Sequence, residues 1–221
     1  MEKSRTLNAV ILYHANHEKY PAKWIEDCVS SIRNQKGQFT VLEMDYNGGM
    51  TPLYEGSLFF SKKLDYEASD KATGRHTGHS HAHNWLCRKA VEIGADYVFN
   101  TNIDDFYHYD RINIQSEYLA QGYDVVTCNM TQIDEDNRVL RQDILFSQMD
   151  IKEHARKGHN IIAHPACAYS KNFIENSGLL NPFEVPKDDF DLWKRSEKFK
   201  FVIAPYTMLY YRIHANNVSK K

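Results

Sequence analysis

An acidic pair that directly follows an apolar run is the first feature of this 221-residue sequence that could do chemistry. Asn102-Ile103-Asp104-Asp105 comes after Asp96–Thr101, which has the length and composition of a buried strand. Adjacent carboxylates repel each other unless a cation lies beside them, and hard oxygen ligands of this kind suit Mg²⁺ or Mn²⁺. The structural alternative is that Asp104 or Asp105 caps a short helix after the strand.

A second acidic cluster, Asp188-Asp189-Phe190-Asp191, places three acids in four residues where a helical pattern begins. Acidic side chains in a first turn stabilise the helix macrodipole, which is a sufficient structural reason for one or two of them. Three acids are more than the macrodipole needs. A carboxylate held at this position could therefore act as a general base.

Four histidines lie in GRHTGHSHAHNW, residues 74–85: His76, His79, His81 and His83. His79 and His83 have the i,i+4 spacing of two metal ligands on one helix face, but no nearby acid completes a metal site. At a helix N-terminus these rings could instead meet phosphate or sugar oxygens. Solvated loop histidines are the other interpretation.

A further histidine lies near an arginine in Tyr211-Arg212-Ile213-His214, after the last predicted strand. A lone histidine is usually a hydrogen-bonded structural residue. Arg212 and His214 together could nevertheless reach a metal ion or a diphosphate.

The elements that must position these groups alternate between strand and helix early in the chain, which predicts an α/β sheet. Strands are expected at 8–13, 39–46, 96–101, 123–131, 139–146, 199–203 and 208–213, and helices at 21–36, 80–93, 111–121, 150–157, 170–176 and 188–196. Residues 50–75 are expected to form a loop, with a possible short strand around 58–60.

Ligands of such sheets bind beyond the carboxyl ends of the strands. Three polar groups follow predicted strands in this way: His14 with Asn16, Asp45, and Asn102–Asp105. Their expected convergence is the main functional signal that the residues give on their own.

Composition excludes several classes of protein. A formal net charge of −2 gives no field that would favour nucleic acid or an anionic membrane. No apolar run is long enough for a membrane span or a signal peptide. The four cysteines are scattered and form no CxxC pair, which predicts reduced thiols and a cytoplasmic protein.

Several of these segments, taken in order, resemble a family 2 glycosyltransferase, and among its members the rhamnosyltransferase-like ones. VILYHANH…WIEDCVSSIRNQ resembles the opening strand, loop and helix of the family, and Asp45 matches an acid that holds the nucleotide base. The stretch from Gly78 to Val98 resembles the approach to the metal-motif strand, and Asn102-Ile103-Asp104 resembles an Asn-x-Asp version of the DxD motif. Asp188–Trp193 resembles Glu-Asp-x-x-Leu-Trp, and the segment from Tyr211 to Ser219 resembles the closing Tyr-Arg-x-His…Ser.

The resemblance implies a single GT-A domain with a mixed, mostly parallel sheet flanked by helices. Its nucleotide-binding half would be about 1–105 and its acceptor-side half about 106–221. It further implies an inverting, Mn²⁺- or Mg²⁺-dependent hexosyl- or deoxyhexosyltransferase. Such an enzyme moves a sugar from a UDP-, GDP- or dTDP-sugar to a glycan or other hydroxyl acceptor.

The implied site residues fall into three groups. Asp189 matches the catalytic base, with Asp188 and Asp191 as substitutes. The metal would be held by Asp104, Asp105 and His214. Contacts with the donor nucleotide are expected from Tyr13, His14, Asp45, His81, His83, Asn84, Asn102, Asp104 and Arg212.

The sequence also departs from the family pattern, which keeps other functions open. Tyr13-His14-Ala15-Asn16 stands where the family has Pro-Thr-Tyr-Asn, Asn102 replaces the first acid of the metal motif, and Asp188 replaces a glutamate. The alternatives are a catalytically degenerate sugar-nucleotide or glycan-binding module, a sugar-phosphate nucleotidyltransferase and a histidine-rich metal-binding protein. No glycine-rich basic loop follows the first strand, which disfavours the nucleotidyltransferase.

Overall fold

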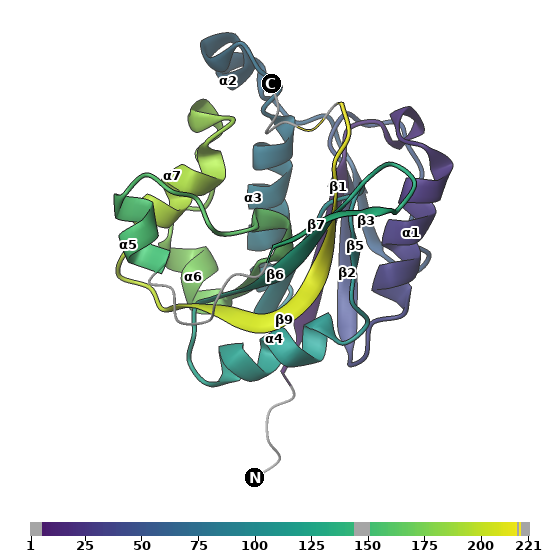
Figure 1. The fold of residues 1–221 in the computed structure, drawn as a ribbon. Coiled ribbons are helices and arrows are strands. Elements are labelled where there is room, and N and C mark those ends of the chain that lie inside the picture. Colours follow the sequence, from purple (N-terminus) through teal and green to yellow (C-terminus); the bar gives the residue numbers. More distant parts are fainter. Residues whose placement is uncertain (1–5, 144–150, 216, 218–221) are drawn as a thin grey trace.

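A mixed sheet with helices on both faces forms the framework of the protein (Figure 1). The computed structural model describes residues 6–143, 151–215 and 217. Within this part of the chain the sheet has nine strands in the order β3-β2-β1-β4-β8-β6-β9-β5, and β7 pairs with β6 beside this path. This confirms the α/β fold expected from the sequence.

The first half of the chain forms parallel ladders. The elements are β1 (Asn8–His14), α1 (Ala22–Arg33), β2 (Phe39–Asp45), β3 (Leu58–Ser61), α2 (Glu67–Thr73), α3 (Gly78–Glu92) and β4 (Tyr97–Thr101). β1 pairs in parallel with β2 and with β4, and β2 pairs in parallel with β3. The carboxyl ends of these strands therefore share one edge of the sheet.

The second half adds both parallel and antiparallel strands. The elements are β5 (Phe106–Tyr107), α4 (Arg111–Ala120), β6 (Val125–Ile133), β7 (Val139–Asp143), α5 (Ile151–Arg156), β8 (Ala168–Ser170), α6 (Lys171–Asn176), α7 (Asp188–Arg195) and β9 (Phe201–Arg212). β6 and β9 run parallel, whereas β8 is antiparallel to β4 and to β6. Parallel ladders hold most of the paired residues.

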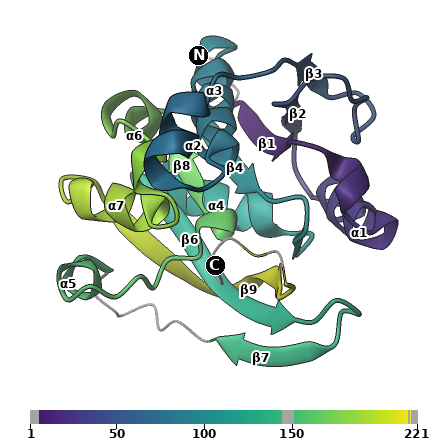
Figure 2. The ribbon, with the colours of Figure 1, turned by 90° about the horizontal axis from the view of Figure 1, so that it is seen from above.

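The two faces of the sheet carry separate cores because successive side chains of a strand point to opposite faces. Ile11 and its neighbours on one face of β1 pack against α3, α6 and α7. Val10 and Leu12 on the other face pack against α1 and α4. Figure 2 shows the same division, with α3 on one side of β1 and α1 on the other.

Most of the predicted elements are confirmed, and the differences lie in short or interrupted segments. The possible strand around 58–60 is β3, but residues 67–73 form α2 where a loop was expected. The two strands predicted at 199–203 and 208–213 are one strand, β9. The β6 register steps from Ala204 to Thr207, so it passes over Pro205 and Tyr206. Proline has no N–H to donate to a ladder, which explains why the pattern looked broken.

Two short strands and the ends of two predicted elements also differ from the expectation. The short strands β5 and β8 were not expected. β7 pairs with β6 as predicted, while residues 144–146 of that prediction and residue 150 of the α5 prediction lie outside the described residues. None of the helices described is long and apolar enough to cross a membrane.

Gly78, at the first position of α3, is required for packing rather than for a tight turn. Its backbone is helical, and its φ angle is not positive. A Cβ atom placed there would lie 2.7 Å from Cε2 of Tyr46 and 3.0 Å from Cε1 of Tyr66. Tyr46, after β2, and Tyr66, before α2, therefore pack directly against the start of α3.

We expect Gly78→Ala to lower the free energy of unfolding by about 1–3 kcal/mol, because two packed rings must move to admit one methyl group. Urea denaturation of the wild type and the variant measures this difference. Arg88→Ala, on the exposed face of the same helix, is the control and should leave stability nearly unchanged. Equal stability of Gly78→Ala and wild type would contradict the packing argument.

Candidate functional site

The polar ends of β1, β2 and β4 meet at one edge of the sheet, toward the top of Figure 1. His14 is the register partner of Asp45, and Leu12 that of Thr101, the residue before Asn102. The convergence predicted from the sequence is therefore present. What each side chain contacts at this edge differs from one residue to the next.

Asp45 is fully buried and holds the turn that follows β2. Its Oδ1 accepts a hydrogen bond from the backbone N–H of Asn47 at 3.0 Å, and its Oδ2 accepts one from Met50 N–H at 2.9 Å. Ser61 Oγ lies 3.4 Å from the same Oδ2. Both carboxylate oxygens thus have partners within the protein.

His14 is directed toward Glu43 rather than toward the solvent edge. Its Nε2 lies 3.2 Å from Glu43 Oε1, and both side chains are fully buried. Glu43 also accepts hydrogen bonds from the backbone N–H groups of Leu53 at 2.6 Å and Tyr54 at 3.0 Å, and from Ser57 Oγ at 3.1 Å. One buried carboxylate therefore orders residues 53–57 above β2.

Glu43 is not among the site residues expected from the sequence, although the sequence carries a signal for it. Glu43 stands within the apolar run FTVLEMDY, and a charged residue buried in a strand needs partners to offset its desolvation. A charge at such a position is evidence for a built polar network.

Tyr13 belongs to a buried polar cluster beneath this edge. Its hydroxyl lies 3.3 Å from Asn100 Oδ1 and 3.5 Å from Asn102 Oδ1. Asn100 Nδ2 lies 3.2 Å from Nδ1 of His164 and donates to the His164 carbonyl at 3.0 Å. Asn100 and His164 were not predicted, and they link the ends of β1 and β4 to the segment before β8.

His83 lies in this cluster and is fully buried. Its ring contacts those of Tyr13, His164 and Tyr169. Burial lowers the pKa of His83 to about 3 and that of His164 to about 4, so both rings are neutral near pH 7. His83 therefore faces the core under the site.

His81 and Asn84 of α3 are engaged with neighbouring segments. His81 Nε2 lies 3.0 Å from Oγ of Ser69 on α2, and burial lowers the pKa of this histidine. Asn84 donates to the Leu180 carbonyl at 2.8 Å and accepts from Leu180 N–H at 3.1 Å. Asn84 thus fixes the chain just after α6.

The first two acids of α7, Asp188 and Asp189, have pKa values that are shifted in opposite directions. Asp188 accepts a hydrogen bond from Ser80 Oγ at 2.5 Å, and His79 Nε2 lies 3.6 Å from it. Burial would raise the pKa of Asp188, but its contacts with His79 and Ser80 outweigh this effect and lower the pKa to about 2. Asp188 is therefore an ionised anchor between α3 and α7.

Asp189 has a pKa raised to about 6, first by burial and then by the negative charge of Asp188. Its Oδ1 accepts from Phe190 N–H at 2.6 Å, and its Oδ2 accepts from Asn160 Nδ2 at 3.0 Å. The third acid, Asp191, instead forms an ion pair with Arg195 at 2.6 Å along the helix surface. Of the three, Asp189 has the pKa that best suits a proton acceptor near neutral pH.

Asp104 and His214 come together from positions 110 residues apart. His214 Nε2 lies 2.9 Å from Asp104 Oδ2, and the ring of His214 contacts that of Trp24. Asp105 is fully buried, and its Oδ1 accepts from Arg212 N–H at 2.9 Å while Oδ2 has no hydrogen-bond partner. Burial and the charge of Asp104 raise the pKa of Asp105.

Arg212 is fully buried, and its guanidinium is enclosed by internal acceptors. It donates to the Asp104 carbonyl at 2.9 Å and to Asp27 Oδ2 at 3.1 Å, and it lies over the ring of Trp24. Further acceptors are the carbonyls of Asp134 and Glu135 and the side chain of Asn137. These contacts fix the loop after β4 to the end of β9.

No three histidine, cysteine or carboxylate groups of residues 6–143, 151–215 and 217 are grouped in a way that could hold a metal ion alone. Asp104 and His214 supply one oxygen and one nitrogen at one place, whereas the fully buried Asp105 is not grouped with them as a third ligand. This donor set fits an ion that takes its other ligands from water and phosphate.

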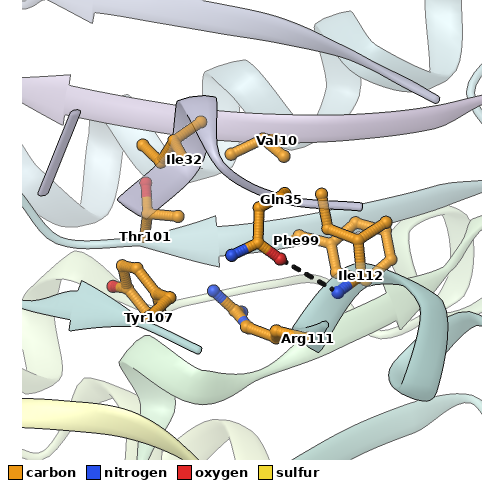
Figure 3. A pocket seen from close by; sticks show the side chains of 8 residues that line it. All are labelled: Val10, Ile32, Gln35, Phe99, Thr101, Tyr107, Arg111 and Ile112. Atoms are coloured by element: carbon orange, nitrogen blue, oxygen red, sulfur yellow. Dashed lines mark hydrogen bonds between the residues drawn. The ribbon is translucent and has the colours of Figure 1, made fainter. Parts of the chain in front are cut away.

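A small pocket lies elsewhere, between α1, α4 and the sheet (Figure 3). Its lining consists of Val10, Ile32, Gln35, Phe99, Thr101, Tyr107, Arg111 and Ile112. Gln35 Oε1 accepts from Ile112 N–H at 3.2 Å, and Arg111 donates to the carbonyls of Asn100 and Cys167. None of the predicted site residues lines this pocket, which is a gap in core packing.

No protein-family model and no curated protein matches the sequence. Solved structures do match the fold. S. aureus TarS 1-349 in complex with UDP-GlcNAc superposes with a TM-score of 0.67 at 10% identity, over 98% of this chain and 61% of that one. TarS 1-349 in complex with UDP gives a TM-score of 0.64 at 13% identity, over 93% and 60%.

TarS is a glycosyltransferase. The chain has a glycosyltransferase fold. It spans about three fifths of the length of these two TarS 1-349 structures. This likeness confirms the GT-A-like architecture expected from the sequence.

We expect Glu43→Gln to lower the free energy of unfolding by about 1.5–3 kcal/mol, because charge-assisted hydrogen bonds from two backbone N–H groups are weakened. Hydrogen exchange at Leu53 and Tyr54 should also become faster. Glu55→Gln, at an exposed position of the same loop, is the matched control. Indistinguishable exchange in the two variants would contradict the role given to Glu43.

Proposed function

We propose that the protein is an inverting, metal-dependent glycosyltransferase of family 2 that moves a sugar from a nucleoside-diphosphate sugar to a hydroxyl acceptor. The observation that carries the proposal is the glycosyltransferase fold over 93% to 98% of the chain. The pair Asp188 and Asp189 supports it, since two adjacent carboxylates with opposite pKa shifts are typical of acid–base sites. Some finer features come from the sequence resemblance alone: the family, inversion and a hexosyl or deoxyhexosyl group.

The donor lies along the carboxyl edge of β1, β2 and β4 in this proposal. TarS structures with UDP and UDP-GlcNAc support a UDP-sugar as the first donor to test, ahead of GDP- and dTDP-sugars. Asp45 acts on the base through the Asn47–Met50 turn that it holds, because both of its oxygens already have partners. His14, His83, Asn84 and Arg212 are framework residues beneath the donor.

Asp104 and His214 are the residues that would hold Mn²⁺ or Mg²⁺. Asp105, the third ligand expected from the sequence, is fully buried and accepts from the backbone N–H of Arg212 instead. When bound there, such an ion would supply positive charge to neutralise the departing diphosphate. Asn102 lies beside Asp104 and also within reach of the Tyr13 hydroxyl, which joins the metal motif to β1.

Asp189 removes the acceptor proton in the transfer step. The acceptor oxygen forms a bond to the anomeric carbon, the bond from that carbon to the diphosphate oxygen breaks, and the hydroxyl proton passes to the Asp189 carboxylate. The nucleoside diphosphate leaves with the electron pair. Asp188 remains ionised and holds the start of α7 against α3.

A sugar-nucleotide-binding module without catalysis is the second candidate. The observation in its favour is that Asp45 and Arg212 are both fully engaged in internal contacts. Hydrolysis of a UDP-, GDP- or dTDP-sugar by the wild-type protein would decide between the two.

Asp189→Asn should lower turnover by about 10²- to 10⁴-fold, the usual contribution of a general base, without weakening donor binding. In the wild type, turnover should fall as pH drops through about 6, where Asp189 takes up a proton and can no longer accept one from the acceptor. Asp191→Asn is the control and should stay close to wild type. A larger loss in Asp191→Asn than in Asp189→Asn would show that the base is misassigned.

Asp104→Ala should abolish the dependence of UDP affinity on Mn²⁺, because the ion loses the carboxylate that meets His214. Calorimetric titration of UDP with and without Mn²⁺ measures this dependence. Asp136→Ala removes an exposed surface carboxylate and should keep the metal dependence of the wild type. Unchanged Mn²⁺-dependent affinity in Asp104→Ala would disprove the metal site.

A further inference from the structure

Asn160 contacts the proposed base from a different part of the chain. It lies between α5 and the 3₁₀ turn His164–Ala166, 29 residues before Asp189. Its Nδ2 donates to Asp189 Oδ2 at 3.0 Å. No feature of the sequence marks it.

The amide of Asn160 is itself held in one orientation. Its Oδ1 accepts a hydrogen bond from the backbone N–H of Ile162 at 3.1 Å. Since the carbonyl oxygen is fixed by a backbone donor, the NH₂ group must be the one that faces the carboxylate. The Asn160 side chain can therefore only donate to Asp189.

Asn160 is itself exposed, and the residues that follow it are anchored in the core. Ile162 is buried in the core that also contains Leu192 and Trp193 of α7. Two residues further on, His164 is bonded to Asn100 of β4. Asn160 is thus placed by α7 and by the strand that leads to Asn102.

The two oxygens of Asp189 have unequal partners. Oδ1 accepts from the adjacent backbone N–H of Phe190, which moves with the residue itself. Oδ2 accepts from Asn160, which is the only hydrogen bond described between this carboxyl group and a segment outside α7. The direction of the carboxylate relative to the rest of the site therefore depends on Asn160.

We propose that Asn160 is a positioning residue that orients the carboxylate of Asp189 for proton transfer. The proposal rests on the function proposed above. Asn160 keeps Oδ2 in one direction, and its N–H stabilises the ionised form of Asp189 against burial and against the charge of Asp188. His79 of α3 faces Asp188 on its other side, with Nε2 3.6 Å from Oδ2.

Asn160→Asp separates this role from a structural one. The new carboxylate still accepts from Ile162 N–H, so the local turn is kept, but it cannot donate to Asp189. Asn172→Ala is the matched control, because Asn172 makes the same kind of hydrogen bond, 2.8 Å from Asp124, on α6 outside the site. Asn160→Ala removes both hydrogen bonds of the amide, to Asp189 and to Ile162, and shows the effect of losing the turn as well.

The experiment measures kcat, KM and the pH profile for whichever UDP-, GDP- or dTDP-sugar the wild type turns over. We expect Asn160→Asp and Asn160→Ala to lower kcat by about tenfold or more, as for loss of one hydrogen bond to a charged group. KM for the donor and UDP affinity should stay at wild-type values. The acidic limb of the profile should move to higher pH, since Asp189 loses the donor that favours its ionised form.

The outcomes separate the two proposals. If the kcat and the pH profile of Asn160→Asp equal those of the control Asn172→Ala, the positioning role is overturned while the transferase function stands. If the loss appears in Asn160→Ala alone, the residue is structural and the proposal is equally overturned. If the wild type turns over no donor of the panel, both proposals fail.

Discussion

β1 pairs in parallel with β2 on one side and with β4 on the other, and the site follows from this arrangement. Parallel strands have their carboxyl ends at one edge, where the buried ladders stop and the backbone turns away. The polar groups at that edge need partners because they remain buried. Glu43 and Asp45 supply them on β2 by accepting N–H groups of the loops that follow. These two carboxylates therefore fix the loops that follow β2 at this edge.

Asp188 and Asp189 are neighbours with the same side chain, but their carboxyl groups have very different pKa values. Asp188 points to Ser80 and His79 at the start of α3 and has a low pKa, whereas Asp189 is desolvated beside that charge and has a raised one. Opposite shifts of this kind keep Asp188 ionised against α3 and leave Asp189 the more readily protonated of the two. The difference arises from α3, an element about one hundred residues earlier in the chain.

The histidines of GRHTGHSHAHNW are divided among different environments by the helix that carries them. His83 faces the core with His164 and is neutral, His81 contacts Ser69 of α2, and His79 reaches Asp188. Of the i,i+4 pair, His79 is therefore partly exposed, whereas His83 is buried in the core. The two rings share one side of α3 but lie one turn apart, so His79 at the helix start reaches Asp188 while His83 lies in the core.

The sequence by itself determined the apolar strands β1, β2 and β4, the helices α1 and α3 and the polar residues at the strand ends. Strands that are buried on both faces need apolar runs, which are visible in the sequence. Tertiary structure decided which partner each polar residue meets. Asp104 contacts His214 from 110 positions away, while Asp45 and Arg212 are enclosed by internal groups. Short elements such as α2, β5 and β8 carry too few residues for a periodic pattern. A residue type fixes what a side chain can donate or accept, but the partner comes from segments distant in sequence, and only packing brings those together.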